Sequence, residues 1–184
     1  AAAVLIIEVE GPAAGLDRQA DRIREICTAN GCREVRDAAD ANARNRLWEG
    51  RRGAFGAVAR LAPNYLVNDC VVPRTRLPEA LAQVAAIAKK HGFEHGNVFH
   101  AGDGNLHPLI LFDSRDPGAV DRVPAAGWEI MLACVALGGT ISGEHGIGVE
   151  KMEGMRLGFS DDDIDAQRAV RRAVEPSGLL NPGK

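Results

Sequence analysis

Two histidines flank a turn-rich segment and could bind one metal ion. The segment Gly102–Asn105 lies between His100 and His107. Asp-Gly between two apolar runs is a strong signal for a hairpin with a two-residue turn, and this register predicts that His100 stands directly opposite His107. Opposed side chains lie about 4.5–5.5 Å apart at Cβ, so both imidazoles could coordinate one divalent cation at about 2.0–2.1 Å. The alternative is that both histidines simply hydrogen-bond to the backbone beside a polar turn.

A second segment, Gly138–Gly148, holds five glycines around an adjacent Glu-His pair. So much glycine predicts a backbone that turns sharply or lies close to another group. Glu144 could supply a carboxylate that completes a His–His–Glu set, and His145 could act as an acid or base near neutral pH. The alternative is a flexible connection whose Glu and His are solvated. The order of the glycines is not that of a dinucleotide-binding fingerprint.

The elements that would position these residues alternate between strand and helix. We expect strands over Val4–Val9, Glu34–Arg36, Tyr65–Val72 and the hairpin arms Asn97–Ala101 and Leu106–Phe112. We expect helices over Asp17–Ala29, Leu77–His91, Pro124–Leu137 and Asp161–Val174, with Asp40–Ala62 helix-forming but interrupted at its glycines. This order favours an α+β fold in which helices pack on one face of a mainly antiparallel sheet. The strands are not uniformly apolar, which argues against a doubly wound parallel sheet.

The composition is that of an ordinary globular domain. The chain has 184 residues, of which 46% are hydrophobic, and a formal net charge of −3 with both signs mixed along its length. This charge pattern gives no reason to expect nucleic acid as a partner. The apolar runs are far shorter than the roughly 20 residues that a membrane-spanning helix needs. Four cysteines without a C-x-x-C pair argue against a disulfide scaffold. The short apolar runs and the cysteine pattern together lead us to expect a soluble intracellular protein.

Taken together, two motifs carry a resemblance to a known family. Asn97–Ile110 and Gly143–Lys151 resemble the C-terminal half of the FAD-linked 2-hydroxy-acid oxidases, a family that includes glycolate oxidase subunits, D-lactate dehydrogenases and D-2-hydroxyglutarate dehydrogenases. The likeness is greatest to the FAD-linked subunits of glycolate oxidases. Leu47–Phe55, Val72–Arg74 and Gly178–Lys184 fit the same pattern, so the resemblance extends over essentially the whole chain.

The resemblance implies a metal centre and a catalytic base. His100, His107 and Glu144 match the metal ligands of the family, for which zinc or manganese is the expected ion. His145 matches the histidine beside the flavin that takes the proton of the substrate hydroxyl. These four residues lie within the two motifs.

The resemblance also implies residues that bind substrate and flavin. Arg51 matches an arginine that binds the substrate carboxylate, and Asn105 matches a polar position near the metal and the substrate. Phe55 and Val67 stand where some relatives have further carboxylate partners, so recognition of the carboxylate is expected to differ here. Three positions expected beside the flavin correspond to Gly143, Gly146 and Asn181.

In the family this half forms a ferredoxin-like α+β cap, expected over about residues 1–115, and a helical segment over about 116–184 that returns to the flavin domain. We expect residues 1–184 to form this single C-terminal domain, without the N-terminal FAD-binding domain of full-length relatives. FAD would be bound mainly by that missing domain, and the chain alone would be inactive. The implied partners are the flavin domain and an iron–sulfur subunit, and the implied location is the cytoplasm, with peripheral attachment to the inner membrane through partners.

The implied reaction is oxidation of a small 2-hydroxy acid, glycolate or D-lactate, to the 2-oxo acid, with hydride transfer to the flavin. Two other interpretations use the same residues. The chain could be a non-catalytic module that binds a metal or docks a subunit, or a metal-dependent hydrolase whose cation activates water. Dependence on flavin would separate oxidation from hydrolysis.

Overall fold

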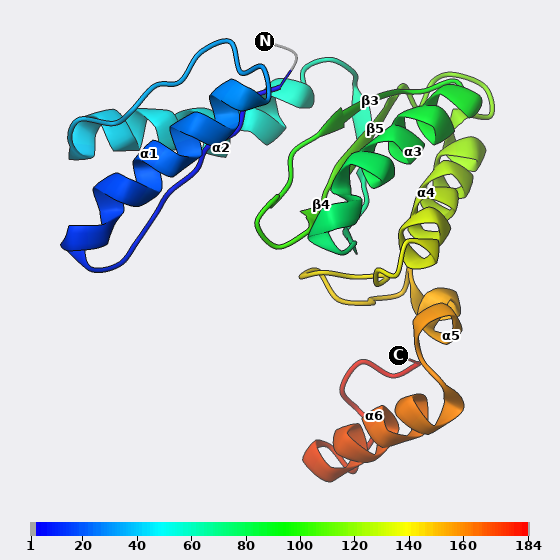
Figure 1. The fold of residues 1–184 in the computed structure, drawn as a ribbon. Coiled ribbons are helices and arrows are strands. Elements are labelled where there is room, and N and C mark those ends of the chain that lie inside the picture. Colours follow the sequence, from blue (N-terminus) through cyan, green and yellow to red (C-terminus); the bar gives the residue numbers. More distant parts are fainter. Residues whose placement is uncertain (1–2, 184) are drawn as a thin grey trace. The chain divides into compact units, whose positions relative to one another are not determined.

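The computed structural model describes residues 3–183, and the chain divides into two compact units between Ala54 and Phe55. Each unit is described by itself. The first unit contains helix α1 (Ala13–Ala29) and most of helix α2 (Ala41–Val58). The second contains all of the strands and the remaining helices (Figure 1).

The strands expected in the first unit are absent, and this part of the prediction is wrong. Val4–Val9 and Glu34–Arg36 form neither helix nor strand. A β-branched run favours extended backbone, but a strand also needs a partner for its backbone hydrogen bonds. The segment Val4–Val9 instead contacts α2 through the side chain of Glu8. This carboxylate accepts hydrogen bonds from Arg44 Nε at 2.8 Å and Trp48 Nε1 at 2.6 Å.

Helix α2 is continuous where the sequence predicted interruptions. It passes through Gly50, Gly53 and Gly56 without a break. Its start is fixed by Asp40, whose side chain accepts a hydrogen bond from the Ala43 N–H at 2.7 Å, as a capping residue does. A helical glycine costs only about 0.5–1 kcal/mol relative to alanine, so flanking residues of good helix propensity outweigh these three.

The second unit is built on antiparallel strands, as the sequence predicts. Strand β5 (Pro108–Phe112) lies in the centre of a three-stranded sheet, between β1 (Asn64–Val67) and β3 (Glu94–Asn97). A separate pair joins β2 (Cys70–Val71) to β4 (Asn105–Leu106). Since β5 has partners on both edges, its residues Pro108–Leu111 are all buried.

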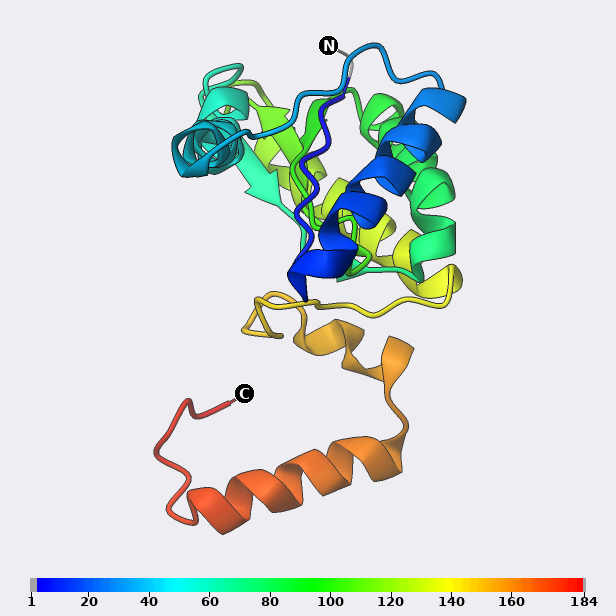
Figure 2. The same cartoon turned by 60° about the vertical axis from the view of Figure 1, so that its left-hand side comes forward.

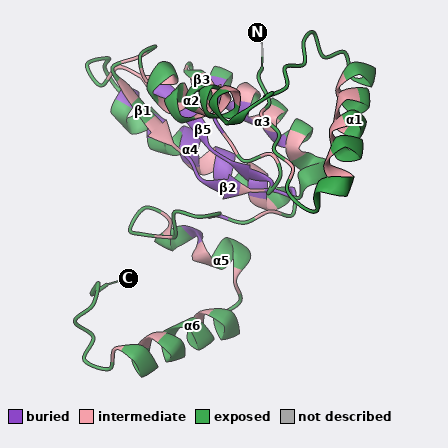
Figure 3. Cartoon of the chain, turned by 90° about the vertical axis from the view of Figure 1, so that its left-hand side faces the viewer, coloured by how far each residue is buried: buried purple, intermediate pink, exposed green. Residues whose placement is uncertain are grey.

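Two helices cover one face of the sheet, which confirms the α+β fold class. Helix α3 (Leu77–Lys90) and helix α4 (Ala119–Ala136) pack against each other, α3 also against β3 and α4 against β5 (Figures 1 and 2). Figure 3 shows the buried residues gathered on the strands and on the helix faces turned toward them. The largest fully buried apolar side chains include Leu106, Leu109, Ile110, Ile130 and Ile141.

The segment after α4 contains short helices and one long one. A 3₁₀ turn (Met152–Gly154) leads into α5 (Met155–Gly158), and α6 spans Asp161–Val174, the range that the sequence predicts. Ser160 and Asp163 form a reciprocal capping box at its start. None of the helices in residues 3–183 combines the length and the apolar character that crossing a membrane requires.

The predicted strand Tyr65–Val72 is divided, and the division creates the site described next. Asn68 and Asp69 separate β1 from β2, and the two strands pair with different sheets. Both polar residues are buried. Asn68 donates from Nδ2 to the Gly127 carbonyl at 2.7 Å and so contacts α4, whereas Asp69 faces a loop that follows α4.

Candidate functional site

The hairpin that carries the two histidines has a longer turn than predicted. His100 pairs with Asn105 rather than with His107. The cause lies at Gly104, which has φ +74° and whose carbonyl accepts a hydrogen bond from the Val72 N–H at 3.0 Å. A Cβ at this position would lie 2.1 Å from the Val72 carbonyl oxygen. Contact with the neighbouring chain therefore fixes a wider loop, and the predicted direct opposition of the histidines is wrong.

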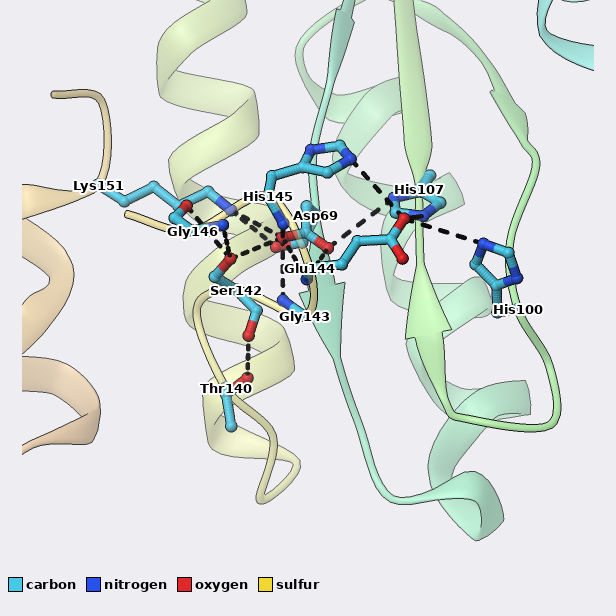
Figure 4. Close-up of polar contacts among 10 residues, drawn as sticks. All are labelled: Asp69, His100, His107, Thr140, Ser142, Gly143, Glu144, His145, Gly146 and Lys151. Carbon is cyan, nitrogen blue, oxygen red and sulfur yellow. Dashed lines mark hydrogen bonds and ion pairs between the residues drawn. The ribbon is translucent and has the colours of Figure 1, made fainter. Parts of the chain in front are cut away.

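The three predicted metal ligands nevertheless come together (Figure 4). One nitrogen each of His100 and His107 and one oxygen of Glu144 all lie within 4.8 Å of one another. Glu144 Oε1 is 3.0 Å from His107 Nε2 and 3.9 Å from His100 Nε2. The two imidazole rings are nearly perpendicular, at 86°, with centroids 5.6 Å apart. The longer turn thus changes the register of the hairpin without separating the rings.

His107 is the buried member of the group. Its side chain is 3% exposed, whereas those of His100 and Glu144 are 46% and 52% exposed. Burial lowers the pKa of His107 below its ordinary value, and the nearby carboxylates of Glu144 and Asp69 only partly oppose this effect. A neutral imidazole is the form that binds metal, so burial keeps His107 in that form.

Asp69 is the part of the site that our reading of the sequence missed. Its carboxylate is 1% exposed and lies against the loop that carries Glu144 and His145. Oδ2 accepts hydrogen bonds from Ser142 Oγ at 2.7 Å and from the N–H groups of Gly143, Glu144 and His145 at 2.9, 3.2 and 3.0 Å. The available signal was the polar pair Asn68-Asp69 inside an otherwise apolar strand.

These contacts keep the Asp69 carboxylate charged. Burial is the largest single influence and raises the pKa of Asp69, but the hydrogen bonds and the Lys151 ammonium together lower it from 3.8 to about 2. Lys151 Nζ donates to the Asp69 carbonyl at 2.8 Å and lies 3.6 Å from Oδ2. Oδ1 is 3.9 Å from His107 Nδ1, which has no hydrogen-bond partner in the described part of the chain.

The loop approaches the hairpin so closely that it needs glycine. A Cβ on Gly143 would lie 2.6 Å from Oδ1 of Asn105, a residue that is itself buried. Gly143 donates its N–H to Asp69, and Gly146, with φ +79°, donates its N–H to Ser142 Oγ at 2.9 Å. Both predicted flavin-binding glycines thus already donate their N–H groups to protein acceptors, Gly143 to Asp69 and Gly146 to Ser142. Their contact with a flavin stays a prediction, and it would rely on close approach rather than on N–H donation.

His145, the predicted base, lies beside the candidate metal ligands. Its ring stacks on that of His107, with centroids 5.1 Å apart and planes 8° apart, and its side chain is 51% exposed. Nε2 is 3.9 Å from Glu144 Oε1. An exposed imidazole next to a possible cation can accept a proton from a molecule bound there.

Two predicted residues lie elsewhere in the chain, and their roles stay predictions. Arg51 is on α2 in the first unit. Asn181 follows α6, has φ 48°, and its carbonyl accepts a hydrogen bond from Arg171. Phe55 and Val67 stand where some relatives have further partners for the substrate carboxylate. The ring centroid of Phe55 lies 6.2 Å from that of His107, and Val67 pairs with β5.

The residues present fit a divalent cation. Two imidazoles and a carboxylate are the set that zinc and manganese accept, and two ligand atoms at about 2.0–2.1 Å from one ion lie at most about 4.2 Å apart. The distances from Glu144 Oε1 to Nε2 of His107 and to Nε2 of His100 fall within this limit, and the exposed side chains of His100 and Glu144 have room to adjust. A second possible group, Asp69 with His107 and His145, fits less well because Asp69 already accepts hydrogen bonds from the loop.

Comparisons with known proteins agree with the resemblance. The family model described as "FAD linked oxidases, C-terminal domain" matches residues 1–184. Over 184 residues, all of this chain, the identity is 44% to the glycolate oxidase subunit GlcD of Escherichia coli (strain K12) and 38% to that of Bacillus subtilis (strain 168). It is 31% over 182 residues, 98% of the chain, to a probable mitochondrial D-lactate dehydrogenase of Danio rerio. The chain spans 37% to 39% of the length of these relatives.

Proposed function

The chain belongs to the family of FAD-linked oxidase C-terminal domains, and from this we propose that it forms the substrate- and metal-binding part of an FAD-dependent 2-hydroxy-acid dehydrogenase. Glycolate and D-lactate are the proposed substrates, because relatives named for these acids share 31% to 44% identity with the chain. The observation that carries the proposal is the convergence of His100, His107 and Glu144 next to the ring of His145.

In the proposed reaction a 2-hydroxy acid becomes a 2-oxo acid. His145 would accept the hydroxyl proton as the C–O single bond becomes a carbonyl, and the flavin, when bound, would supply the acceptor for the hydride that leaves C2. His145 suits this role because its ring is half exposed and stacks on a candidate ligand. A base that is positioned in this way contributes typically 10²–10⁴-fold to the rate.

His100, His107 and Glu144 would hold the divalent cation. When bound, that ion would polarise the hydroxyl and carboxylate oxygens of the substrate and lower the pKa of the hydroxyl. The buried, neutral His107 supplies the fixed ligand, and the two exposed side chains supply the adaptable ones. Asn105, buried and with Oδ1 unpartnered in the described residues, supplies a polar group at the base of this site.

We assign binding of the substrate carboxylate to Arg51, because a guanidinium can bind a carboxylate through two parallel hydrogen bonds. Phe55 and Val67 cannot donate such bonds, so recognition of the carboxylate would depend more on Arg51 here than in relatives with polar residues at those positions. FAD would come with a flavin-binding domain, which Gly143, Gly146 and Asn181 would approach. We also propose that an iron–sulfur subunit would accept the electrons from the flavin.

The test uses the protein in which this chain is joined to its flavin-binding domain. The purified flavoprotein, freed of metal and then supplied with Zn²⁺ or Mn²⁺, is mixed without oxygen with glycolate or D-lactate, and flavin absorbance is followed. We expect bleaching that requires the cation and gives glyoxylate or pyruvate. A flavin that stays oxidised with either acid while the cation is bound would contradict the proposal and favour a binding module. Hydrolysis without flavin would favour the hydrolase.

A further inference from the structure

A buried carboxylate holds the loop on which two of the proposed functional side chains stand. Asp69 Oδ2 accepts the N–H groups of three successive residues, Gly143–His145, as well as the hydroxyl of Ser142. Successive N–H groups directed at one oxygen form an anion-binding concavity. In this case the anion belongs to the protein and comes from a position more than 70 residues earlier in the chain.

The functional side chains on this loop have little else to fix their direction. Those of Glu144 and His145 are 52% and 51% exposed, so packing restrains them little. Residues 141–150 contain neither helix nor strand. Where side chains are not packed, the direction of each Cα–Cβ bond is set by the backbone, and here the backbone is held by Asp69 (Figure 4).

We propose that Asp69 is a positioning residue for the site: it binds the Ser142 hydroxyl and the Gly143–His145 backbone so that Glu144 faces His100 and His107, and His145 stacks on His107. This inference rests on the proposed function, since it explains how that site is assembled. Lys151 completes the arrangement, because its ammonium donates to the Asp69 carbonyl and lies near the carboxylate. The loop residues Ser142–His145 and Lys151, whose ammonium balances the charge of Asp69, therefore come from one stretch of sequence.

The test compares three variants of the flavin-containing protein. Asp69→Asn keeps the size of the side chain and removes its charge. Lys151→Met removes the counter-ion at a more exposed position and serves as a second variant if Asp69→Asn fails to fold. Asn68→Ala is the matched control, because Asn68 is buried beside Asp69 but donates to the Gly127 carbonyl of α4 and not to the loop.

Two measurements separate positioning from general support of the fold. The first is amide hydrogen exchange of residues 142–148 against the rest of the chain, below the melting temperature of every variant. The second is the affinity for Mn²⁺ or Zn²⁺ alone, in competition with a chromophoric chelator. We expect Asp69→Asn to raise exchange in this segment by a larger factor than in the rest of the chain and to weaken cation binding by about 10–100-fold, as loss of a partner of the ligands does. Lys151→Met should shift both readouts in the same direction but less, and Asn68→Ala should lower the melting temperature without either effect.

Other results would overturn the proposal. One such result is that Asp69→Asn changes neither the amide exchange of residues 142–148 nor the affinity for the cation, which would show that the loop keeps its place without this anchor. If Asp69→Asn does not fold, the same result in Lys151→Met would show this. Exchange that rises by the same factor in every segment would show that Asp69 only supports the fold. A parent protein that binds neither cation would instead contradict the proposed function, and the exchange of residues 142–148 would still decide the role of Asp69.

Discussion

The ring of His145 stacks on the ring of His107 with their planes only 8° apart. The two histidines otherwise differ, since His107 is buried and His145 is half exposed. A single carboxylate oxygen, Glu144 Oε1, lies 3.0 Å from Nε2 of His107 and 3.9 Å from Nε2 of His145. This arrangement predicts different roles for the two rings: the buried ring of His107 binds the cation, and the exposed ring of His145 accepts the proton of the substrate hydroxyl.

The first prediction concerns the exposed ring. In the flavin-containing protein, His145→Gln should reduce kcat by roughly 10²–10⁴-fold, because glutamine cannot accept the hydroxyl proton. Bound metal, measured by elemental analysis, should stay at the level of the parent. A proportional loss of metal would instead make His145 a ligand, as the alternative group with Asp69 and His107 would require.

The second prediction concerns the buried ring. His107→Ala should weaken binding of Zn²⁺ or Mn²⁺ by at least about 100-fold, because it removes the one candidate ligand that is held rigidly by burial. The matched control is His95→Ala, since His95 lies on β3 and pairs with Ile110 outside the candidate cluster. Isothermal titration calorimetry measures both. Equal affinity in the two variants would remove His107 from the metal site.

The third prediction follows from the lowered pKa of His107. Burial disfavours the imidazolium, so the ring should titrate below 6.5 when it is followed by NMR in the metal-free protein. The unfolded chain then binds more protons than the folded one as pH falls below 6.5, so this residue's contribution to the free energy of unfolding is complete above that pH and is lost below it. The stability advantage of the parent over His107→Gln should therefore shrink as pH falls, and a constant advantage would contradict the pKa direction.

The fourth prediction concerns Asp69 and stability. Its pKa is lowered from 3.8 to about 2, which corresponds to ~2 kcal/mol of the free energy of unfolding at neutral pH. That contribution is present above the unfolded value and is lost as pH falls toward about 2. Chemical denaturation should show Asp69→Asn less stable than the parent at pH 7 by about this amount. The gap should close in acid, and a gap independent of pH would point to lost packing rather than lost charge.

The fifth prediction tests the close approach of loop and hairpin. Gly143→Ala should displace the loop, because its Cβ would lie 2.6 Å from Asn105 Oδ1. We expect cation affinity and kcat to fall by about 10-fold or more, since small misplacements at a site are costly. Gly102→Ala is the control, as a Cβ there meets nothing within 4 Å. Equal effects of both substitutions would show that general changes in loop flexibility are responsible.

The sequence predicts well those elements whose signals are local. Helix α6 has the predicted bounds, because its capping box and charged ends lie within the element itself. Val4–Val9 failed as a strand because pairing depends on a partner that composition does not reveal. The hairpin turn was mispredicted for a similar reason, since contact of Gly104 with Val72 sets its length.

For the candidate site, motifs indicated which residues meet but not what holds them. The gathering of His100, His107 and Glu144 was anticipated from the hairpin and the resemblance, even though the register was wrong. Asp69 was not, because its hydrogen bonds to Gly143–His145 join residues 74 to 76 positions apart. The two polar residues that interrupt an apolar strand were the one local trace of this contact.

The unequal exposure of the three candidate ligands has a kinetic consequence. A cation held by one buried and two exposed side chains would enter and leave from the solvent side without any opening of the apolar core. Its exchange would therefore be decoupled from unfolding, and a chelator would remove it far faster than the chain unfolds. Which ion occupies the site would then depend on the supply of free cations around the protein, so preparations from different media would differ in metal while sharing one fold.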